Sequence, residues 1–286
     1  MYFRLHLGRK AVWILLIVLA LLAVYPVIFL SAGSLMGADE LEDCLGAVVS
    51  GAEGYASFPA LPKYPTLQHF AEVLLDSPEF FVMFWNSILI TFGVLGGQFV
   101  AGTMAAWGFA RYEFPCKRGI FLLYIVLMLL PFQVLMLSDY LLLDRLRLLD
   151  SLWAVILPGM FSTFPVFIMY RFFAEIPDSL IESARLDGAR EWQLFWYLAL
   201  PMGSSGIIAA LVLGFLEYWS LIEQPLTFIK DKSKLPLSVF LPDLTMTGKA
   251  GFLFAVSVVT FLPAIIVFMG GRDYLEQGIM AGAVKE

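Results

Sequence analysis

Two carboxylates lie inside an otherwise apolar run late in the chain. Glu217 and Glu223 both fall in the run Ser204–Ile229. A carboxylate at the middle of a bilayer costs about 2.5–3.5 kcal/mol even on insertion scales, so both side chains should avoid lipid. If the run is one helix rising about 1.5 Å per residue, Glu217 is roughly 20 Å along it and Glu223 is near its far end. Glu217 is therefore either a polar group that lines a passage or a buried hydrogen-bonding residue that joins helices.

A second polar feature is a loop between the fourth and fifth apolar runs, with Glu182–Ala189 at its centre. Ser179 stands three residues before Glu182, which is the spacing of a capping box, so the sequence predicts a helix that begins there after Pro177. Gly188 offers a C-terminal stop for this helix. The loop is thus expected to begin with one short polar helix.

A further short helix is expected from about Arg190 to Leu198, ended by Pro201. Two short helices joined at a glycine would form a compact, rigid knob that could fit a socket on another protein. The alternative is an amphipathic hairpin lying on lipid. Five acidic residues between Glu175 and Glu191 oppose adhesion to an anionic leaflet.

The sequence also argues against several chemistries. The Gly248-Lys249 pair is followed by Ala250 rather than Ser or Thr, so the chain has no phosphate-binding loop of its own. The two histidines, His6 and His69, lie outside the apolar runs and form no ligand cluster for a metal. No serine sits in a nucleophile-elbow context. The chain is therefore expected not to be an enzyme.

Composition places these features in a membrane protein. Hydrophobic residues make up 60% of the 286 residues and charged residues 15%, with a mean hydropathy of +0.83, whereas soluble domains are roughly 45–50% apolar. The length suits several helical spans of about 20 residues each. We predict an all-α, polytopic protein with a single transmembrane domain over 1–286. Its six spans are expected at 11–30, 80–110, 119–137, 151–173, 204–229 and 251–271.

The distribution of Lys and Arg predicts the topology. The long segment 31–79 holds one lysine and eight acidic residues, whereas Arg4, Arg9 and Lys10 precede the first span. The positive-inside rule then places the N-terminus in the cytoplasm and 31–79 outside. An even number of spans returns the C-terminus to the cytoplasm, and the polar loop 177–201 falls on the same side.

Small residues recur every four positions in the second span, which indicates a face for close helix packing. They are Gly93, Gly97, Ala101 and Ala105.

The polar loop resembles the EAA loop of ATP-binding-cassette (ABC) importer permeases. That loop reads Glu-Ala-Ala, three residues, Gly, nine residues, Ile, one residue, Leu-Pro; here Ser183 and Leu198 are the departures. Further similarities occur at Arg111–Pro115, Leu130–Gln133, Ile176-Pro177 and Ala281–Lys285. Together they resemble the shorter permease of carbohydrate ABC importers, the maltose-transporter type, over 11–286.

The resemblance implies a type I ABC importer fold in which the loop 177–201 is a cytoplasmic coupling helix that docks into an ATPase subunit. It implies that ATP and Mg are bound by the ATPase subunits and that this chain binds no cofactor or metal. The other implied partners are a second, related permease, an extracytoplasmic solute-binding protein and the lipid bilayer of a bacterial inner membrane, with no nucleic acid. The coupling residues would be Glu182, Ser183, Ala184, Asp187, Gly188 and Pro201.

The implied function is alternating-access import of a mono- or oligosaccharide. Two alternatives remain open: a permease for a non-sugar solute, and an ion-coupled secondary transporter that uses Glu217. The second would be expected to show inverted internal repeats, which we do not find in the sequence. The candidate residues of the translocation path are Gln133, Glu217, Trp219, Ser220 and Glu223.

Overall fold

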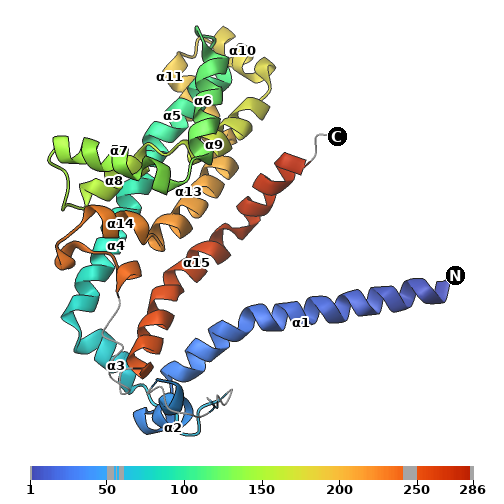
Figure 1. Ribbon diagram of the computed structural model, residues 1–286. Coiled ribbons are helices and arrows are strands. Elements are labelled where there is room, and N and C mark those ends of the chain that lie inside the picture. The colour runs from blue at the N-terminus through green and yellow to red at the C-terminus, as the bar shows by residue number, and fades with distance from the viewer. Residues whose placement is uncertain (1, 50–54, 56, 58–60, 241–249, 284–286) are drawn as a thin grey trace. The chain divides into compact units, whose positions relative to one another are not determined.

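The computed structural model describes residues 2–49, 55, 57, 61–240 and 250–283. Every regular element within these ranges is a helix (Figure 1). The chain divides into two compact units. Unit 1 comprises Met1–Phe80 and Leu241–Leu262, and unit 2 comprises Phe81–Phe240 and Pro263–Glu286.

Unit 1 contains α1 (Tyr2–Ser34), α2 (Ala38–Val49), α3 (Gln68–Leu75) and the first part of α15 (Ala250–Ala283). Its small core centres on Met36, which is fully buried beside Ala32 and Leu41. The rings of Phe29 and Phe254 meet edge to face with centroids 5.5 Å apart. These contacts join the end of α1 to α15 through aromatic packing.

Unit 2 contains all but the first three residues of a long helix that runs from residue 78 to residue 111 and includes one π-helical turn. The long helix consists of α4 (Pro78–Gly97), η1 (Gln98–Gly102) and α5 (Thr103–Arg111). The helices that follow are α6 (Lys117–Leu129), α7 (Phe132–Arg145), α8 (Trp153–Met160), α9 (Thr163–Glu175), α10 (Asp178–Leu186), α11 (Glu191–Gln193), the π-helix η2 (Leu194–Ala199), α12 (Leu200–Met202), α13 (Ser204–Trp219) and α14 (Glu223–Phe228). Two short 3-10 turns, η3 (Lys232–Lys234) and η4 (Leu237–Val239), come last.

The core of unit 2 forms where α9 packs against α5 and α13. Phe173 and Met169 of α9 are fully buried there. Close approach depends on small residues, because a Cβ atom on Gly203 would lie 2.3 Å from the Phe173 ring. A second cluster joins α4, α8 and α13 through Val94, Val155 and Tyr218.

Among the described residues, four helices are long and apolar enough to cross a bilayer. They are Val12–Ser34, Pro78–Arg111, Trp153–Glu175 and Ala250–Glu276. Up to six spans result if each of two bent helix pairs counts as one. The first pair, α6 and α7, bends by 104° around Pro131, and the second bends by 71° around Gly203. A proline lacks the N–H that would continue the hydrogen-bond ladder, which explains the first break.

The expectation that Glu217 and Glu223 share one helix is wrong. Helix α13 ends at Trp219, and Glu223 opens the separate helix α14. Pro225 explains this geometry, because a proline in the first turn of a helix forfeits no intrahelical hydrogen bond. The six-span count, the span limits and the single domain over 1–286 stay predictions.

Candidate functional site

The polar loop begins with helix α10, which starts at Asp178 rather than at Ser179. Pro177 is its N-cap, and no side chain caps the helix. The predicted capping box between Ser179 and Glu182 is therefore wrong. The proline fixes an extended backbone at φ −61° and ψ 134° immediately before Asp178, so the helix starts one residue early and Ser179 already lies in its first turn. The Ser183 hydroxyl donates back to the Ser179 carbonyl at 2.8 Å.

Gly188 ends the helix in the predicted manner. Its φ of +86° is in the left-handed region, which a glycine adopts without strain. The Gly188 N–H donates to the Arg185 carbonyl at 3.0 Å, and the Ala189 N–H donates to the Ala184 carbonyl at 3.0 Å. This pair of bonds is a complete Schellman motif. It gives the turn at Asp187 and Gly188 a single, well-defined shape.

The second arm of the loop is longer than predicted. It is one continuous helix over Glu191–Met202 that contains the π-helix η2. Pro201 does not end it, so that expectation is wrong; the bend occurs at Gly203 instead. Pro201 is the second residue of α12, directly after the π-helix. At the N-terminal end of the arm, the Gln193 side-chain oxygen accepts from the Arg190 N–H at 2.8 Å.

Two residues at the end of α5 fasten the loop. The Arg111 guanidinium donates to the Asp178 carboxylate and to the Phe173 carbonyl, both at 2.6 Å, and also to the Ile176 carbonyl. It lies 5.7 Å from the centroid of the Trp107 ring, in a cation–π contact. The motif that contains Arg111 signalled the family resemblance, but its role here depends on partners more than 60 positions away, which the sequence does not reveal.

Tyr112 and Arg185 secure the other arm of the loop through Glu191. The Tyr112 hydroxyl donates to Glu191 Oε2 at 2.8 Å, and Arg185 Nε donates to Glu191 Oε1 at 3.0 Å. Partial burial, followed by the neighbouring Glu191 carboxylate, raises the pKa of Tyr112. The hydrogen bond to Glu191 raises the pKa of Arg185. Both arms are thus tied to each other and to α5.

The loop has a buried face and an exposed face. Ile181, Leu194 and Phe195 are buried in the core of unit 2, and Ala184 packs against that core. Leu186 is 90% exposed. Of the other predicted coupling residues, those with exposed positions are Glu182, Ser183, Asp187, Gly188 and Pro201. The loop is therefore a supported turn that presents carboxylates and one large apolar side chain outward.

The candidate path residues fall into three environments. Gln133 Nε2 donates to both carboxylate oxygens of Glu223, at 2.8 and 2.7 Å, which links α7 to α14. Trp219 is buried and stacks on Phe215 with centroids 5.5 Å apart, so it belongs to the packing of unit 2. The exposed Ser220 donates to the Leu216 carbonyl at 2.7 Å.

Glu217 is exposed, and its carboxylate makes no hydrogen bond or ion pair in the described part of the chain. The structure therefore brings together Gln133 and Glu223 but leaves Glu217 apart from them.

The small-residue stripe lies partly against α8. A Cβ atom on Gly97 would lie 2.2 Å from the Met160 side chain, and one on Gly93 would lie 3.1 Å from Ile156. Ala105 packs against the main core, and Ala101 is half-buried. Helices α4 and α8 can approach closely only because Gly93 and Gly97 lack side chains.

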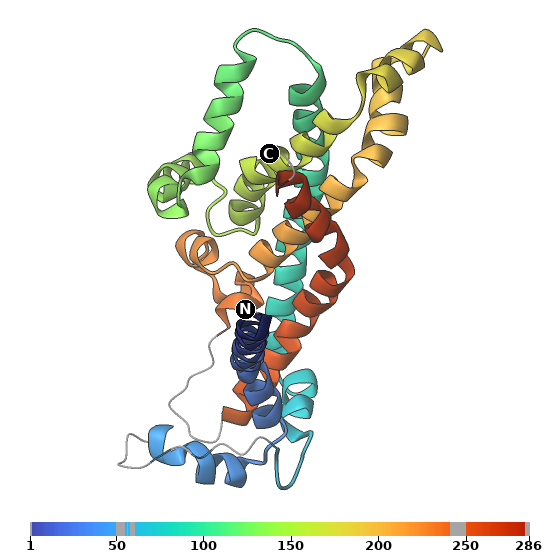
Figure 2. The ribbon, with the colours of Figure 1, turned by 90° about the vertical axis from the view of Figure 1, so that its right-hand side faces the viewer.

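In unit 2, α10 and α11 lie at one end of α13, and α14 lies at the other (Figures 1 and 2). Residues 98–281 match the family described as binding-protein-dependent transport system inner membrane component. This match covers well over half of the chain and includes the whole loop. The chain belongs to this family. It is therefore a permease subunit, a multi-pass component of the inner membrane, and a transport protein rather than an enzyme.

Several members of the family are similar to this permease along most of their length. The arabinooligosaccharides transport system permease protein AraQ of Bacillus subtilis is 27% identical over 97% of this chain and 96% of its own. The sn-glycerol-3-phosphate transport system permease protein UgpE of Yersinia pestis is 26% identical over 72% of this chain and 74% of its own.

A solved structure shares the fold. It is the crystal structure of a bacterial ABC transporter involved in the import of the acidic polysaccharide alginate, which matches with a TM-score of 0.79 at 18% identity over 94% of this chain and 96% of that chain. The helical, polytopic architecture of an ABC importer permease is thus confirmed.

Proposed function

We propose that this permease couples a separate ATPase to transport through the Glu182 loop, defined as residues 178–202. The observation that carries the proposal is the Schellman turn at Gly188. The turn packs on the core of unit 2 and exposes Glu182, Leu186 and Asp187 on its other face. A rigid turn can transmit a displacement without deforming, because Arg111 and Tyr112 tie both of its arms to α5. Exposed Leu186 supplies the apolar contact that a protein socket would bury.

The wider assembly follows from this role. ATP and Mg would bind to the ATPase subunits, and closure of these subunits would move the Glu182 loop and the attached helices as a body, which gives alternating access. A second, related permease would complete the path, and an extracytoplasmic solute-binding protein would deliver the cargo. Both termini of this chain would lie in the cytoplasm, with the Glu182 loop on the same side of the bilayer.

The coupling proposal can be tested by replacing Leu186→Asp in the assembled complex. The ATPase subunits should no longer co-purify with the permease, since a carboxylate in place of the apolar contact would be desolvated in the socket. Leu75→Asp is the matched control, because Leu75 is an 80% exposed leucine at the end of α3. Normal co-purification of Leu186→Asp, or an equal loss in both variants, would remove the proposal.

We infer further that the cargo is a neutral carbohydrate. Relatives carry names that refer to both neutral and acidic cargo. In this chain Glu217 and Glu223 are exposed, and neither carboxylate pairs with a Lys or Arg among the described residues. Such carboxylates accept hydrogen bonds from sugar hydroxyls but repel a carboxylate or phosphate cargo.

The cargo proposal is tested with the complex reconstituted in vesicles together with its solute-binding protein. Uptake of a labelled neutral oligosaccharide should exceed uptake of sn-glycerol 3-phosphate, and Glu223→Gln should narrow the difference between them. Faster uptake of the anion by the unmodified complex would contradict a neutral cargo. It would leave the coupling role of the Glu182 loop intact.

A further inference from the structure

Helix α7 is followed by a turn in which two residues adopt left-handed backbone conformations. Arg147 has φ +55° and Asp150 has φ +57°. Aspartate tolerates this region better than most residues do, because its short side chain can hydrogen-bond locally. At Asp150, however, the side chain bonds to a distant part of the chain. The conformation therefore serves a tertiary contact rather than a local one.

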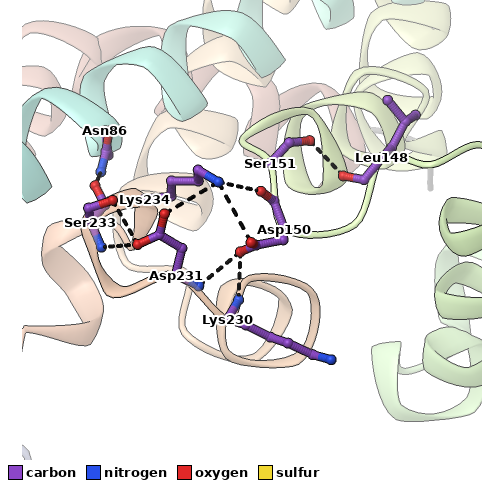
Figure 3. Close-up of polar contacts among 8 residues, drawn as sticks. All are labelled: Asn86, Leu148, Asp150, Ser151, Lys230, Asp231, Ser233 and Lys234. Carbon is purple, nitrogen blue, oxygen red and sulfur yellow. Dashed lines mark hydrogen bonds and ion pairs between the residues drawn. The ribbon is translucent and has the colours of Figure 1, made fainter.

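Asp150 uses its side chain and both of its backbone groups to hold the segment 228–234 (Figure 3). Its Oδ1 accepts from the Lys230 N–H at 3.0 Å and from the Asp231 N–H at 2.8 Å. The Asp150 N–H donates to the Phe228 carbonyl at 2.9 Å, and Lys234 Nζ donates to the Asp150 carbonyl at 2.9 Å. These four hydrogen bonds all cross from one turn to a segment about 80 positions later.

The same segment is closed on itself and attached to α4. Asp231 Oδ1 accepts from the Ser233 N–H at 3.0 Å and from the Ser233 hydroxyl at 2.8 Å. Asn86 Nδ2 donates to the Ser233 carbonyl at 2.8 Å and to the Leu235 carbonyl at 3.1 Å. The Lys230 side chain points away from Asp150 (Figure 3), and it is exposed. The segment thus has a fixed backbone and an outward-facing cation.

The segment begins with Phe228, the last residue of α14, and α14 begins with Glu223. Phe228 is buried with Leu143 of α7 and Ala154 of α8. The Phe132 ring meets the Phe228 ring at 5.8 Å, and Gln133 binds Glu223. Apolar packing and hydrogen bonds therefore connect the Asp150 turn, segment 228–234 and the Glu223 carboxylate through α7 and α14.

We propose that Asp150 is a positioning residue that makes segment 228–234, α14 and the end of α7 move as one body. When the solute-binding protein contacts this segment, the movement is transmitted to Gln133 and Glu223. The inference rests on the proposed function. With a cytoplasmic N-terminus, a segment that follows the fifth of six spans lies on the extracytoplasmic side, where the solute-binding protein would bind, and Glu223 would face the cargo. Without the Asp150 carboxylate, the Lys230 and Asp231 N–H groups lose their acceptor, and the segment samples other shapes. Asp150 itself need not touch the solute-binding protein or the cargo.

The experiment compares three variants in the reconstituted complex with the ligand-loaded solute-binding protein of the same transport system. Asp150→Gly removes the acceptor and suits the left-handed backbone, so it adds no strain. Asp150→Asn keeps an oxygen acceptor and serves as the conservative variant. Asp144→Asn is the control, because Asp144 is exposed in the last turn of α7 and its side chain makes no ion pair or hydrogen bond in the described structure.

Two readouts are measured. Asp150→Gly should raise the concentration of solute-binding protein needed for half-maximal ATPase stimulation about ten-fold, because apparent affinity scales with the fraction of molecules in the competent shape. Basal ATPase activity should not change. Amide hydrogen exchange at Lys230 and Asp231 should accelerate in the same variant. Asp150→Asn should lie between Asp150→Gly and the control in both readouts.

Faster exchange with unchanged half-maximal stimulation would overturn the proposal, and so would unchanged exchange in Asp150→Gly. If Asp150→Gly does not fold, Asp150→Asn decides, and behaviour identical to Asp144→Asn overturns the proposal. Failure of the unmodified complex to respond to any solute-binding protein is a different result. It would contradict the proposed function, whereas the exchange arm would still report whether Asp150 orders the segment.

Discussion

Two regions of unit 2 are each held by one charged side chain that satisfies backbone groups, but the charges are opposite. Beside the Glu182 loop, the Arg111 guanidinium donates to the carbonyls of Phe173 and Ile176 at the end of α9, where Pro177 has no N–H to offer. In segment 228–234, the Asp150 carboxylate serves the N–H groups of Lys230 and Asp231. The Arg111 side chain is 9% exposed and that of Asp150 is 42% exposed. Water therefore screens the second anchor and not the first.

The difference suggests distinct mechanical roles for the two regions. A guanidinium stays protonated at any physiological pH, and Arg111 also rests on a packed core. This suits the proposed role of the Glu182 loop, which is to transmit force in every transport cycle. A half-exposed carboxylate that binds a short segment is easier to release. This suits the proposed role of segment 228–234, a surface that binds the solute-binding protein transiently.

The largest effect is expected for the anchor of the Glu182 loop. Arg111→Met keeps most of the buried volume but leaves the Ile176 carbonyl and Asp178 without their donor and removes one of the two donors to the Phe173 carbonyl. The free energy of unfolding should therefore fall by about 3 kcal/mol. Chemical denaturation of the purified permease in detergent measures this change. Arg111→Lys should recover only part of the loss, because an ammonium cannot span three acceptors as a planar fork does.

Arg118→Met is the control for Arg111→Met, since Arg118 is exposed in the first turn of α6. If both methionine variants lose the same stability, the loss does not come from the contacts of Arg111, and Arg111 is not the strong anchor that the comparison with Asp150 requires.

The next effect concerns the turn that the Arg111 anchor supports. Gly188→Val places a β-branched residue at φ +86°, which should cost roughly 1–2 kcal/mol of stability. Uptake by the reconstituted complex should fall further than the stability does, because the turn displays Glu182 and Asp187. Gly119→Val is matched, because Gly119 is also exposed with no atom within 4 Å of its Cβ position and has no positive φ. Wild-type uptake by Gly188→Val would mean that the shape of the turn is not used.

The sequence predicts the Gly188 turn because a local rule determines it. A glycine at the end of a polar helix readily adopts the left-handed conformation, because it has no Cβ atom. The start of the same helix was mispredicted, because the capping-box spacing of Ser179 and Glu182 competes with Pro177, and the proline restricts the backbone more strongly. Pro131 and Pro225 likewise predict breaks in the chain. They do not predict the 104° angle at Pro131 or the separate helix α14 around Pro225.

The two anchors could not be predicted, because their partners are distant in sequence. In the sequence, Arg111 is one more cation at the end of a span. Two of its three acceptors are carbonyls that any residue could supply, and the third, Asp178, is one of several acids in the loop. Asp150 reads as a turn residue, and its donors are equally anonymous backbone N–H groups. Tertiary bonds from a side chain to the backbone leave no residue type to recognise on the second partner. This explains why the sequence indicates the Glu182 loop but not the two side chains that anchor these regions.

A smaller effect is expected where α4 holds the far end of segment 228–234. Asn86→Ala removes two hydrogen bonds to carbonyls and should lower the unfolding free energy by about 1 kcal/mol, since water can replace the donor at a partly exposed site. Asn86→Asp is the sharper variant, because it puts an acceptor against the same carbonyls and should cost at least as much. Thermal unfolding of the permease in detergent measures both. A stabilising Asn86→Asp would show that the donor is not needed.

The smallest effect is the pH response that separates the two anchors. The Asp231 and Lys230 N–H groups, aided by Lys234, lower the pKa of Asp150, and hydrogen bonds from Ser233 lower the pKa of Asp231. A carboxyl whose pKa is lower in the folded state than in the unfolded state contributes stability above its unfolded pKa of about 3.9, and this contribution is lost as the pH falls through the lowered value.

Hydrogen exchange at Lys230 and Asp231 should therefore accelerate below about pH 4, relative to the intrinsic rate of exchange at each pH. Exchange at Gly188 and Ala189 should accelerate less, because backbone carbonyls, which do not titrate, accept directly from these two N–H groups. The one carboxyl of this loop whose pKa is lowered, Glu191, bonds to Tyr112 and Arg185 and not to these N–H groups. Asp150→Asn should remove most of the acid response of segment 228–234, and equal acceleration in both regions would contradict the contrast between a carboxylate anchor and a guanidinium anchor.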